Sequence, residues 1–435
     1  MKRNKNKKRR VWPILIAAVV ALIAVAAVYC HFGGFGTGPC ADTEAMRTCA
    51  TEIADITIPS GTRVIGLGEA THGNREFQQL RLDVFRHLVQ DYGIRGFALE
   101  GDFGGCEVVN RYIHGGEGSA REAAAAIGFA IYRTEETEQL IEWMRTWNEA
   151  AEEGEDLCFY GYDSQRIAWS RAYLLEAASS RGIDTRELEQ LCATADPDQT
   201  FGGEGDRDII NDIREQLIRL KPEESGDPSL EKAIHYADSL LQNIELGTLF
   251  RNNDVSANAV RDSQMKDNVL WILRQEEQRG NEAVLICGHN GHIRKSGQYG
   301  PDQDCMGALL AADIGEDGYF AIGTDFFKAT DNLPILDGGR TLHTLYSYDP
   351  LAKAADRCGY DVCWLDFAAI PEDSSLREQT DGYINMGMIG EVEADGLSGV
   401  MLRLIPASYR IKYAPGEMYN GMIFVSDAHP IEIQE

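Results

Sequence analysis

Residues 62–77 have the sequence Thr62-Arg-Val-Ile-Gly-Leu-Gly-Glu-Ala-Thr-His-Gly-Asn-Arg-Glu-Phe77, and the rest of the chain is organised around them. Its first half, residues 64–67, is apolar and predicts a short buried strand. Its second half is a glycine-flanked turn that opens a helix and carries Glu69, His72, Arg75 and Glu76. Open α/β sheets bind ligands at the carboxyl ends of their strands, so this turn is a candidate site. The alternative is an ordinary turn in which His72 only caps the helix.

The same strand-and-helix pattern recurs along the chain. Apolar residues at helical spacing follow over residues 76–92, and a second predicted strand, 96–100, ends in Glu100. Strand, helix and strand in this order form the βαβ unit of a parallel sheet. Further apolar runs that each end in an ionisable residue occupy residues 157–163, 283–289, 319–325 and 361–366. We therefore predict an α/β fold with a mainly parallel sheet flanked by helices, with a site at its carboxyl edge.

The later part of the chain predicts a helical insertion and two further strands. Residues 164–278 have no strand-like run and show helical spacing instead. We predict a catalytic α/β domain in two parts, 44–163 and 281–435, interrupted by a helical cap over 164–280. Edge strands are expected at 399–404 and 421–425.

The N-terminus has the pattern of a membrane-inserted segment. Residues 1–10 contain seven Lys or Arg and no acid, and residues 11–29 carry no charge. Nineteen such residues span about 30 Å as a helix, which is one bilayer core. Basic flanks stay in the cytoplasm. We expect a cytoplasmic segment (1–10), a transmembrane anchor (11–30), a linker (31–43) and an extracytoplasmic catalytic domain. The alternative is a signal peptide cleaved near Ala24-Val-Ala26, which would give a secreted protein.

Composition and charge exclude one class of partner. The chain is 44% hydrophobic and 25% charged, as in globular proteins. Its net charge is −28, and because its first ten residues are basic, the remaining chain is more acidic still. Such a surface repels nucleic acid, so we expect no nucleic-acid partner. It could attract a cationic small molecule.

Candidate catalytic groups are carried by four segments and two nearby arginines: Glu69 with His72, Glu100, Asp163, His289 with His292, and Arg81 and Arg261. The sequence contains no G-x-S-x-G elbow, no HExxH and no Walker loop. A histidine and glutamate site without an evident nucleophile favours direct attack by water. One imidazole would take the water's proton while a carboxylate holds its ring. The other histidine and an arginine would face the developing oxyanion.

Two alternative functions use the same residues. Histidine and glutamate are also ligand types for Zn²⁺ or Mn²⁺, so a metal-dependent hydrolase is one alternative. A surface binding protein that has lost turnover is the other. The ten cysteines form no CxxC pair, so we expect no cysteine metal framework.

Five motifs in order resemble those of the erythromycin esterase family: Gly68-Glu-Ala-Thr-His-Gly-Asn-Arg-Glu-Phe77, Ala98-Leu-Glu100, Phe159-Tyr-Gly-Tyr-Asp163, Arg261-Asp-Ser-Gln-Met-Lys-Asp-Asn-Val269 and Gly288-His-Asn-Gly-His292. The resemblance covers residues 45–425 and implies an α/β sheet with a helical cap. It also implies hydrolysis of a macrolide lactone or similar small-molecule ester without a metal or other cofactor. In that reaction His72 would be the water-activating base, with partners Glu69, Arg81, Glu100 and His289. We assign substrate binding to His292, Arg75, Glu76, Asp163 and Arg261.

Overall fold

The computed structural model describes residues 5–31, 33–194, 199–221, 226–300, 303–335, 339–390 and 409–434. Its centre is an eight-stranded sheet in which seven strands follow the order β3-β2-β4-β1-β7-β12-β9, and β8 pairs with β7. The strands are β1 (Val64–Glu69), β2 (Gly96–Asp102), β3 (Cys158–Asp163), β4 (Val284–His289), β7 (Tyr319–Pro334), β8 (Arg340–Tyr346), β9 (Val362–Asp366) and β12 (Gly421–Ala428). Six of them are mutually parallel, while β8 and β9 run antiparallel to their neighbours. The predicted α/β fold with a mainly parallel sheet is confirmed.

Three sequence-based expectations about strands need correction, and a fourth lies outside the described residues. Strand β9 is antiparallel to β12, so Asp366 ends it at the opposite edge of the sheet from the other strand ends. Strand β7 continues from Asp325 to Pro334, because it also pairs with β8 there. Strand β12 is an interior strand, since it pairs with both β7 and β9. The strand expected at 399–404 lies outside the described residues.

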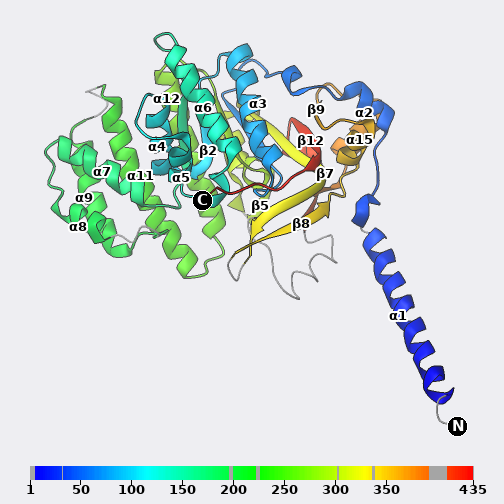
Figure 1. The fold of residues 1–435 in the computed structure, drawn as a ribbon. Coiled ribbons are helices and arrows are strands. Elements are labelled where there is room, and N and C mark those ends of the chain that lie inside the picture. Colours follow the sequence, from blue (N-terminus) through cyan, green and yellow to red (C-terminus); the bar gives the residue numbers. More distant parts are fainter. Residues whose placement is uncertain are drawn as a thin grey trace.

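Helices cover both faces of the sheet, as Figure 1 shows. Side chains along a strand alternate between its faces, so each strand contributes to two separate apolar cores. Ile65 and Phe97 belong to the core under α3 (Arg75–Tyr92), α5 (Ala120–Ala126) and α6 (Glu135–Ala150). Val64 and Ala98 belong to the core on the other face. Helices of that face are α7 (Ala168–Ser180), α9 (Arg207–Ile218), α11 (Pro228–Arg251), α12 (Ala257–Gln278), α14 (Met306–Ile314) and α15 (Pro350–Cys358).

Residues 164–280 form no strand in their described part. They contain α7, α8 (Arg186–Thr194), α9, α11 and α12. Helices α7, α8, α9 and α11 gather at the left of the molecule in Figure 1. Helix α12 instead packs against β3 and β4, which brings its first turns to the carboxyl edge of the sheet.

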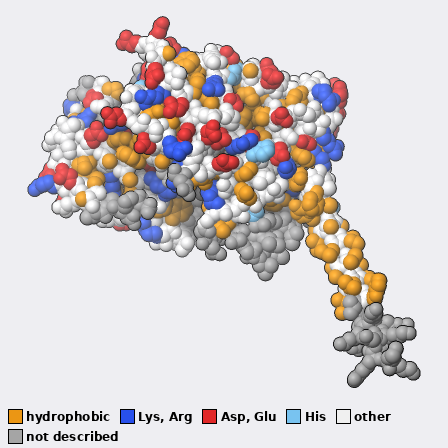
Figure 2. All heavy atoms as spheres, in the orientation of Figure 1, with side chains coloured by type: hydrophobic (Ala, Val, Ile, Leu, Met, Phe, Trp, Pro, Cys, Tyr) orange, Lys and Arg blue, Asp and Glu red, His pale blue; other side chains and the backbone are white. Residues whose placement is uncertain are grey.

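The remaining elements are short, except for the first helix. They are α2 (Thr43–Cys49), α4 (Phe103–Ile113), α13 (Asn290–Ile293), α16 (Ser375–Asp381), α18 (Pro415–Met418) and the strand pairs β5 (Gln298–Gly300) with β6 (Gln303–Asp304) and β10 (Ile384–Gly387) with β11 (Arg410–Tyr413). Helix α1 (Lys5–His31) projects from the body, and apolar side chains predominate on its described part, residues 12–31 (Figure 2). Its residues Trp12–His31 are long and apolar enough to cross a membrane, although a signal sequence has the same length and composition.

Candidate active site

The carboxyl ends of four parallel strands bring the predicted site residues together. Glu69 ends β1 and His289 ends β4, and the two are register partners. Asp163 ends β3. Glu100 lies in β2 where the register with β3 shifts between Leu99 and Asp102. Irregularities of this kind re-aim a side chain, and here they occur beside the candidate site.

Glycine allows Glu100 to approach the neighbouring strand closely. A Cβ atom on Gly288 would lie 2.2 Å from the hydroxyl of Tyr162 and 2.8 Å from Oε2 of Glu100. Without that atom, the backbone N–H of His289 donates to Oε2 of Glu100 at 2.7 Å. Any larger residue at 288 would push this carboxylate away from β4.

His72, Glu69 and Arg81 form one buried chain of interactions. Nδ1 of His72 is hydrogen-bonded to Oε1 of Glu69, and Nη2 of Arg81 donates to Oε2. All three residues are less than 5% exposed. Burial alone would raise the pKa of Glu69, but Arg81 and His72 outweigh it and lower this pKa to about 2. Because Glu69 is ionised and can only accept, Nδ1 of His72 carries a proton.

Arg261, from α12, joins the carboxylates of two strands. Its Nη2 lies 2.7 Å from Oε1 of Glu100 and 2.7 Å from Oδ2 of Asp163. Burial opposes ionisation of Glu100, but His292, Arg261 and His72 together hold its pKa well below the usual range. Glu100 is therefore a permanent negative charge and is a poor proton donor or acceptor near pH 7.

His289 is fixed by the backbone at both ring nitrogens. Its Nε2 donates to the carbonyl of Ile389 at 3.0 Å, and its Nδ1 accepts from the N–H of Gly291 at 3.2 Å. Burial, followed by the nearby His72 and His292, lowers the pKa of His289 to about 3, so the ring is neutral at pH 7. Its ring centre lies 5.1 Å from that of His72. The ring of His289 therefore packs beside that of His72. Because its one N–H group is bonded to the carbonyl of Ile389, it directs no donor at an oxyanion.

The pKa of His292 is shifted in the opposite direction to that of His289. Its Nδ1 lies 2.7 Å from Oδ1 of Asp262, and its Nε2 lies 3.4 Å from Oε1 of Glu100. Burial lowers the pKa of His292, but these two carboxylates outweigh burial and raise it. Asp262 also accepts from the backbone N–H of Met306 at 2.8 Å, which ties α12 to α14.

A cavity of about 260 Å³ opens above this network. It is lined by His72, Glu100, Phe129, Ala130, Ile131, Tyr132, Asp163, Gln165, Arg166, Arg261, Pro334 and Arg340. These described lining residues include no serine, threonine or cysteine. Glu69, Arg81, His289 and His292 lie behind the lining and contact its members.

Arg75 and Glu76 are not among the residues that line this cavity. Glu76 accepts from the backbone N–H of His429 at 2.6 Å and from its Nδ1 at 2.8 Å. Nε of Arg75 donates to Glu76 at 3.2 Å. The first turn of α3 therefore binds the C-terminal segment, and the two residues expected to bind substrate connect these two parts of the chain instead.

Sequence reasoning missed several of the lining residues, among them Tyr132, Arg166 and Arg340, which carry charged or hydrogen-bonding groups. The hydroxyl of Tyr132 donates to the carbonyl of Glu100 at 2.6 Å, and the guanidinium carbon of Arg81 lies 5.0 Å from its ring centre. Arg166 follows the end of β3 by three residues, and that position could have indicated it. Tyr132 and Arg340 belong to no motif, so no local signal pointed to them.

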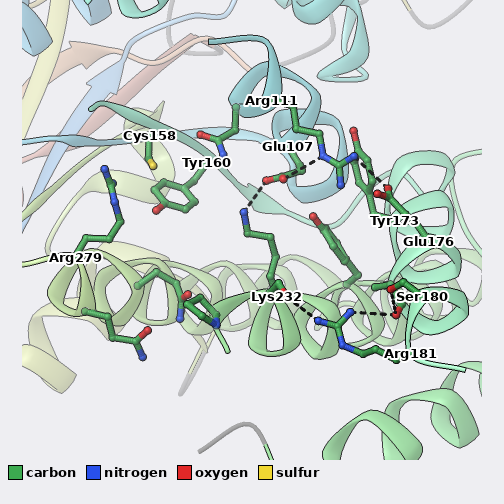
Figure 3. A pocket seen from close by; sticks show the side chains of 17 residues that line it. Glu107, Arg111, Cys158, Tyr160, Tyr173, Glu176, Ser180, Arg181, Lys232 and Arg279 are labelled. Carbon is green, nitrogen blue, oxygen red and sulfur yellow. Dashed lines mark hydrogen bonds and ion pairs between the residues drawn. The ribbon is translucent and has the colours of Figure 1, made fainter. Parts of the chain in front are cut away.

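A second cavity of about 550 Å³ lies at the opposite end of β3, where the strand begins at Cys158 (Figure 3). Its cations are already paired with acids. Arg111 binds Glu107 and Glu176, and Lys232 binds Glu107. The cavity contains none of the predicted catalytic groups.

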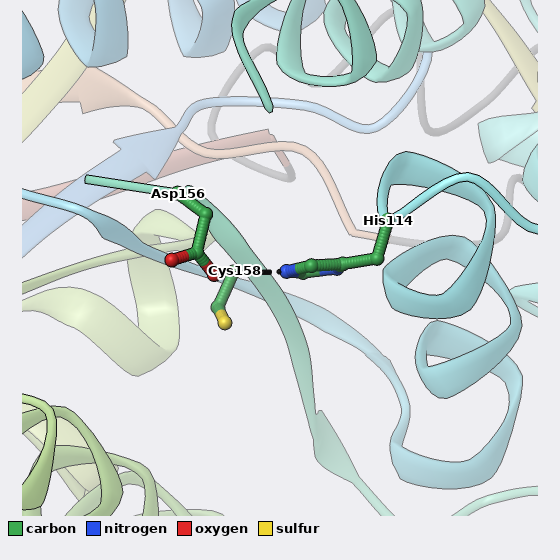
Figure 4. A group of neighbouring side chains, drawn as sticks. All are labelled: His114, Asp156 and Cys158. Atoms are coloured by element: carbon green, nitrogen blue, oxygen red, sulfur yellow. Dashed lines mark hydrogen bonds and ion pairs between the residues drawn. The ribbon is translucent and has the colours of Figure 1, made fainter. Parts of the chain in front are cut away.

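One cluster in the described residues has metal-ligand types within reach of one another. The ligand atoms of His114, Asp156 and Cys158 all lie within 4.8 Å (Figure 4). Arg279 donates to Asp156 at 3.0 Å, and burial raises the pKa of the Cys158 thiol to about 12. The carboxylate is thus paired with a cation and the thiol stays protonated, as in an ordinary ion-pair network. All ten cysteines are free thiols.

Comparisons with known proteins agree on one family. A model of the erythromycin esterase family matches residues 89–428, a range that includes Glu100, Arg261 and His289 but begins after His72. Erythromycin esterase type II of Escherichia coli is 29% identical over 72% of this chain and 82% of its own length. The putative hydrolase YbfO of Bacillus subtilis is 20% identical over 54% of this chain and 57% of its own length.

Solved structures share the fold. A Bacillus cereus protein superposes with a TM-score of 0.73 and 16% identity, covering 90% of this chain and 98% of its own. A succinoglycan biosynthesis protein gives a TM-score of 0.69 at 17% identity, over 90% of this chain and 98% of its own. A mutant of the erythromycin esterase EreC in its open conformation gives 0.57 at 16% identity, over 86% and 93%. The family match spans more than half of the chain, and the chain therefore belongs to the erythromycin esterase family.

Proposed function

We propose that the protein hydrolyses a small-molecule ester or lactone by direct attack of water, with His72 as the general base. Membership of the erythromycin esterase family supports an ester hydrolase. The observation that carries the mechanism is the chain Arg81–Glu69–His72, which ends at the cavity. With a proton on Nδ1, the neutral imidazole has its lone pair on Nε2, where it can accept a proton from water. Glu69 then stabilises the imidazolium that forms.

Arg261 is the group we assign to the developing oxyanion. Its guanidinium lines the same cavity as His72 and is oriented by Glu100 and Asp163. A preorganised cation in a largely buried site stabilises developing negative charge strongly. We assign His289 a positioning role instead, because both of its ring nitrogens bind the backbone.

The metal-dependent alternative fits these residues less well. Both oxygens of Glu69 are bonded, to His72 and to Arg81, and both oxygens of Glu100 are bonded, to Arg261 and to the N–H of His289. A divalent cation would have to displace a guanidinium at each carboxylate. This arrangement supports metal-independent hydrolysis, and metal chelation tests it.

The test is an activity assay of the full chain in detergent against panels of esters and lactones, including macrolides. General-base catalysis contributes about 10²–10⁴-fold, or about 3–5 kcal/mol of barrier. We expect His72→Asn to lose that factor in kcat with little change in substrate binding. His114→Asn, a histidine outside the cavity, is the matched control and should keep wild-type rates. Incubation with EDTA should leave the wild-type rate unchanged.

Three results would contradict the proposal. Turnover by His72→Asn at the wild-type rate would return His72 to a helix-capping role. Loss of activity in EDTA with recovery on added Zn²⁺ or Mn²⁺ would establish the metal-dependent alternative. If the whole panel is bound but never cleaved, the protein is a binding protein.

A further inference from the structure

The charges that line the candidate active-site cavity are unevenly balanced. Two carboxylates, Glu100 and Asp163, face it together with three guanidinium groups, those of Arg166, Arg261 and Arg340. Arg261 is paired with both carboxylates. The other two arginines form no ion pair with any carboxylate of the described residues. An acidic protein of net charge −28 thus has an excess of positive charge in this cavity.

Arg166 is held in place by neutral groups. Its Nε donates to the carbonyl of Gly128 at 2.9 Å, and its Nη1 donates to Thr200 Oγ1 at 3.2 Å. Its guanidinium carbon lies 4.7 Å from the ring centre of Phe129. The backbone N–H of Arg166 binds Asp102, but burial raises the pKa of that carboxyl to about 7, so it is only a partial counter-charge at neutral pH.

Arg340 enters the cavity from β8, on a different part of the chain. Its Nε donates to the side-chain oxygen of Asn332 at 3.1 Å, and its Nη2 donates to the carbonyl of the same residue. Burial lowers the pKa of Arg340, and no acid of the described residues offsets this effect. A half-buried guanidinium held by neutral acceptors keeps further donors for a ligand, since each guanidinium has five N–H groups.

We propose that the substrate is an anionic ester, whose carboxylate, sulfate or phosphate group binds Arg166 and Arg340 while its ester bond lies at His72. This inference rests on the proposed hydrolase function and names its substrate class. Arginine forks match planar and tetrahedral oxyanions and give charge-assisted hydrogen bonds. The apolar side chains of Phe129, Ile131 and Pro334 lie in the same cavity and suit an apolar body in the same molecule. The acidic surface acts at long range and is screened by salt, so these local cations decide selectivity.

The experiment compares phenyl esters that share one leaving group and differ only at the end of the acyl chain. That end is a carboxylate, a sulfonate, a phosphonate, a trimethylammonium or a methyl group. We expect the anionic esters to have the highest kcat/KM, by about 10- to 100-fold over the methyl ester, as charge-assisted hydrogen bonds provide. The order among the three anions identifies the natural group.

Variants assign the effect to the two arginines. Arg166→Gln and Arg340→Gln should each reduce the ratio of kcat/KM for the preferred anionic ester to kcat/KM for the methyl ester by about tenfold or more. Arg219→Gln, at an exposed arginine that directly follows α9 and lies outside the cavity, is the control. Equal losses on all esters, or equal rates for charged and neutral esters in the wild type, would overturn the proposal. A preference for the trimethylammonium ester would overturn it as well.

Calorimetry with the corresponding non-hydrolysable amides separates this inference from the proposed function. Cleavage of esters without any charge preference keeps the hydrolase and refutes the anion site. Selective binding of anionic amides that is lost in Arg166→Gln and Arg340→Gln, with no ester cleaved, keeps the anion site and refutes the hydrolase.

Discussion

Glu69 is bonded on both carboxylate oxygens, by His72 on one and by Arg81 on the other. Both Arg81 and Glu69 are almost fully buried, so each compensates the desolvation of the other. Removing one partner from such a pair leaves an uncompensated buried charge, which costs about 3–5 kcal/mol. The catalytic proposal and the stability of this site therefore depend on the same three side chains.

We expect Glu69→Gln to lower the free energy of unfolding by about 3–5 kcal/mol and to reduce kcat. Urea denaturation at pH 7 measures the first effect and the ester assay measures the second. The double variant Glu69→Gln with Arg81→Met should recover part of the stability, because no buried charge is then unpaired. Equal losses for the single and double variants would show that the pair is not coupled.

The pH dependence of stability has a defined sign at Glu69. Its folded pKa, about 2, lies below the usual value of about 4.3 for an unfolded chain. Its contribution is therefore fully present above about pH 5 and is lost as the pH falls toward 2. The difference in the free energy of unfolding between the wild type and Glu69→Gln should therefore be larger at pH 6 than at pH 3, as urea denaturation at the two pH values measures.

At the scale of elements, Asp325 and Asp349 connect three parts of the fold. Asp325, inside β7, accepts from the N–H of Gly387 at the end of β10 at 2.8 Å. Asp349 caps α15 and accepts from the N–H of Leu351 at 2.7 Å. Burial raises the pKa of both carboxyls, and the proximity of Asp349 raises that of Asp325 further. The pair is therefore most stable when it carries a proton.

We expect the wild type to lose stability as the pH rises from about 4 through 6, because the folded Asp349 has a pKa of about 6 and the unfolded residue about 3.9. Asp349→Asn should remove most of this slope, since an amide can donate to Asp325 without a proton from solvent. At pH 8 the variant should be roughly 2–3 kcal/mol more stable than the wild type. Urea denaturation at pH 5 and pH 8 provides the measurement, and parallel slopes for the two proteins would contradict it.

At the scale of the whole molecule, the segment Trp12–His31 of α1 is long and apolar enough to cross a membrane. We propose that α1 is a membrane anchor with the body outside the cytoplasmic membrane. A reporter that is active only after export, fused after Glu435, should be active, and the intact chain should be found in the membrane fraction. Arginines at Val19 and Leu22 cost about 2.5–3.5 kcal/mol each at the centre of a span and should reduce both signals. Activity of a cytosol-only reporter would refute this topology, and a shortened chain in the medium would show a cleaved signal peptide.

Local sequence patterns alone predicted the strands whose ends carry Glu69, Glu100, Asp163 and His289, and so predicted that these residues lie at one edge of the sheet. A short run of apolar residues indicates each strand, and the polar residue near its end belongs to the same local pattern. Parallel strands then place their carboxyl ends at the same edge of the sheet. The glycines beside these residues could also be read from the sequence. The close approach of Glu100 to Gly288 could not, because it depends on how β2 and β4 pair.

The other residues that line the cavity, and the different hydrogen-bond partners of each histidine, could not be predicted from local patterns. Strand order and direction depend on contacts between distant segments, so the antiparallel β9 and the interior position of β12 had no local signal. Arg166 and Arg340 come from separate elements and meet only at the cavity. His289 and His292 are close in sequence, yet one is held by backbone groups and the other by carboxylates. The pKa of a side chain follows from its burial and its neighbours, and both are set by packing.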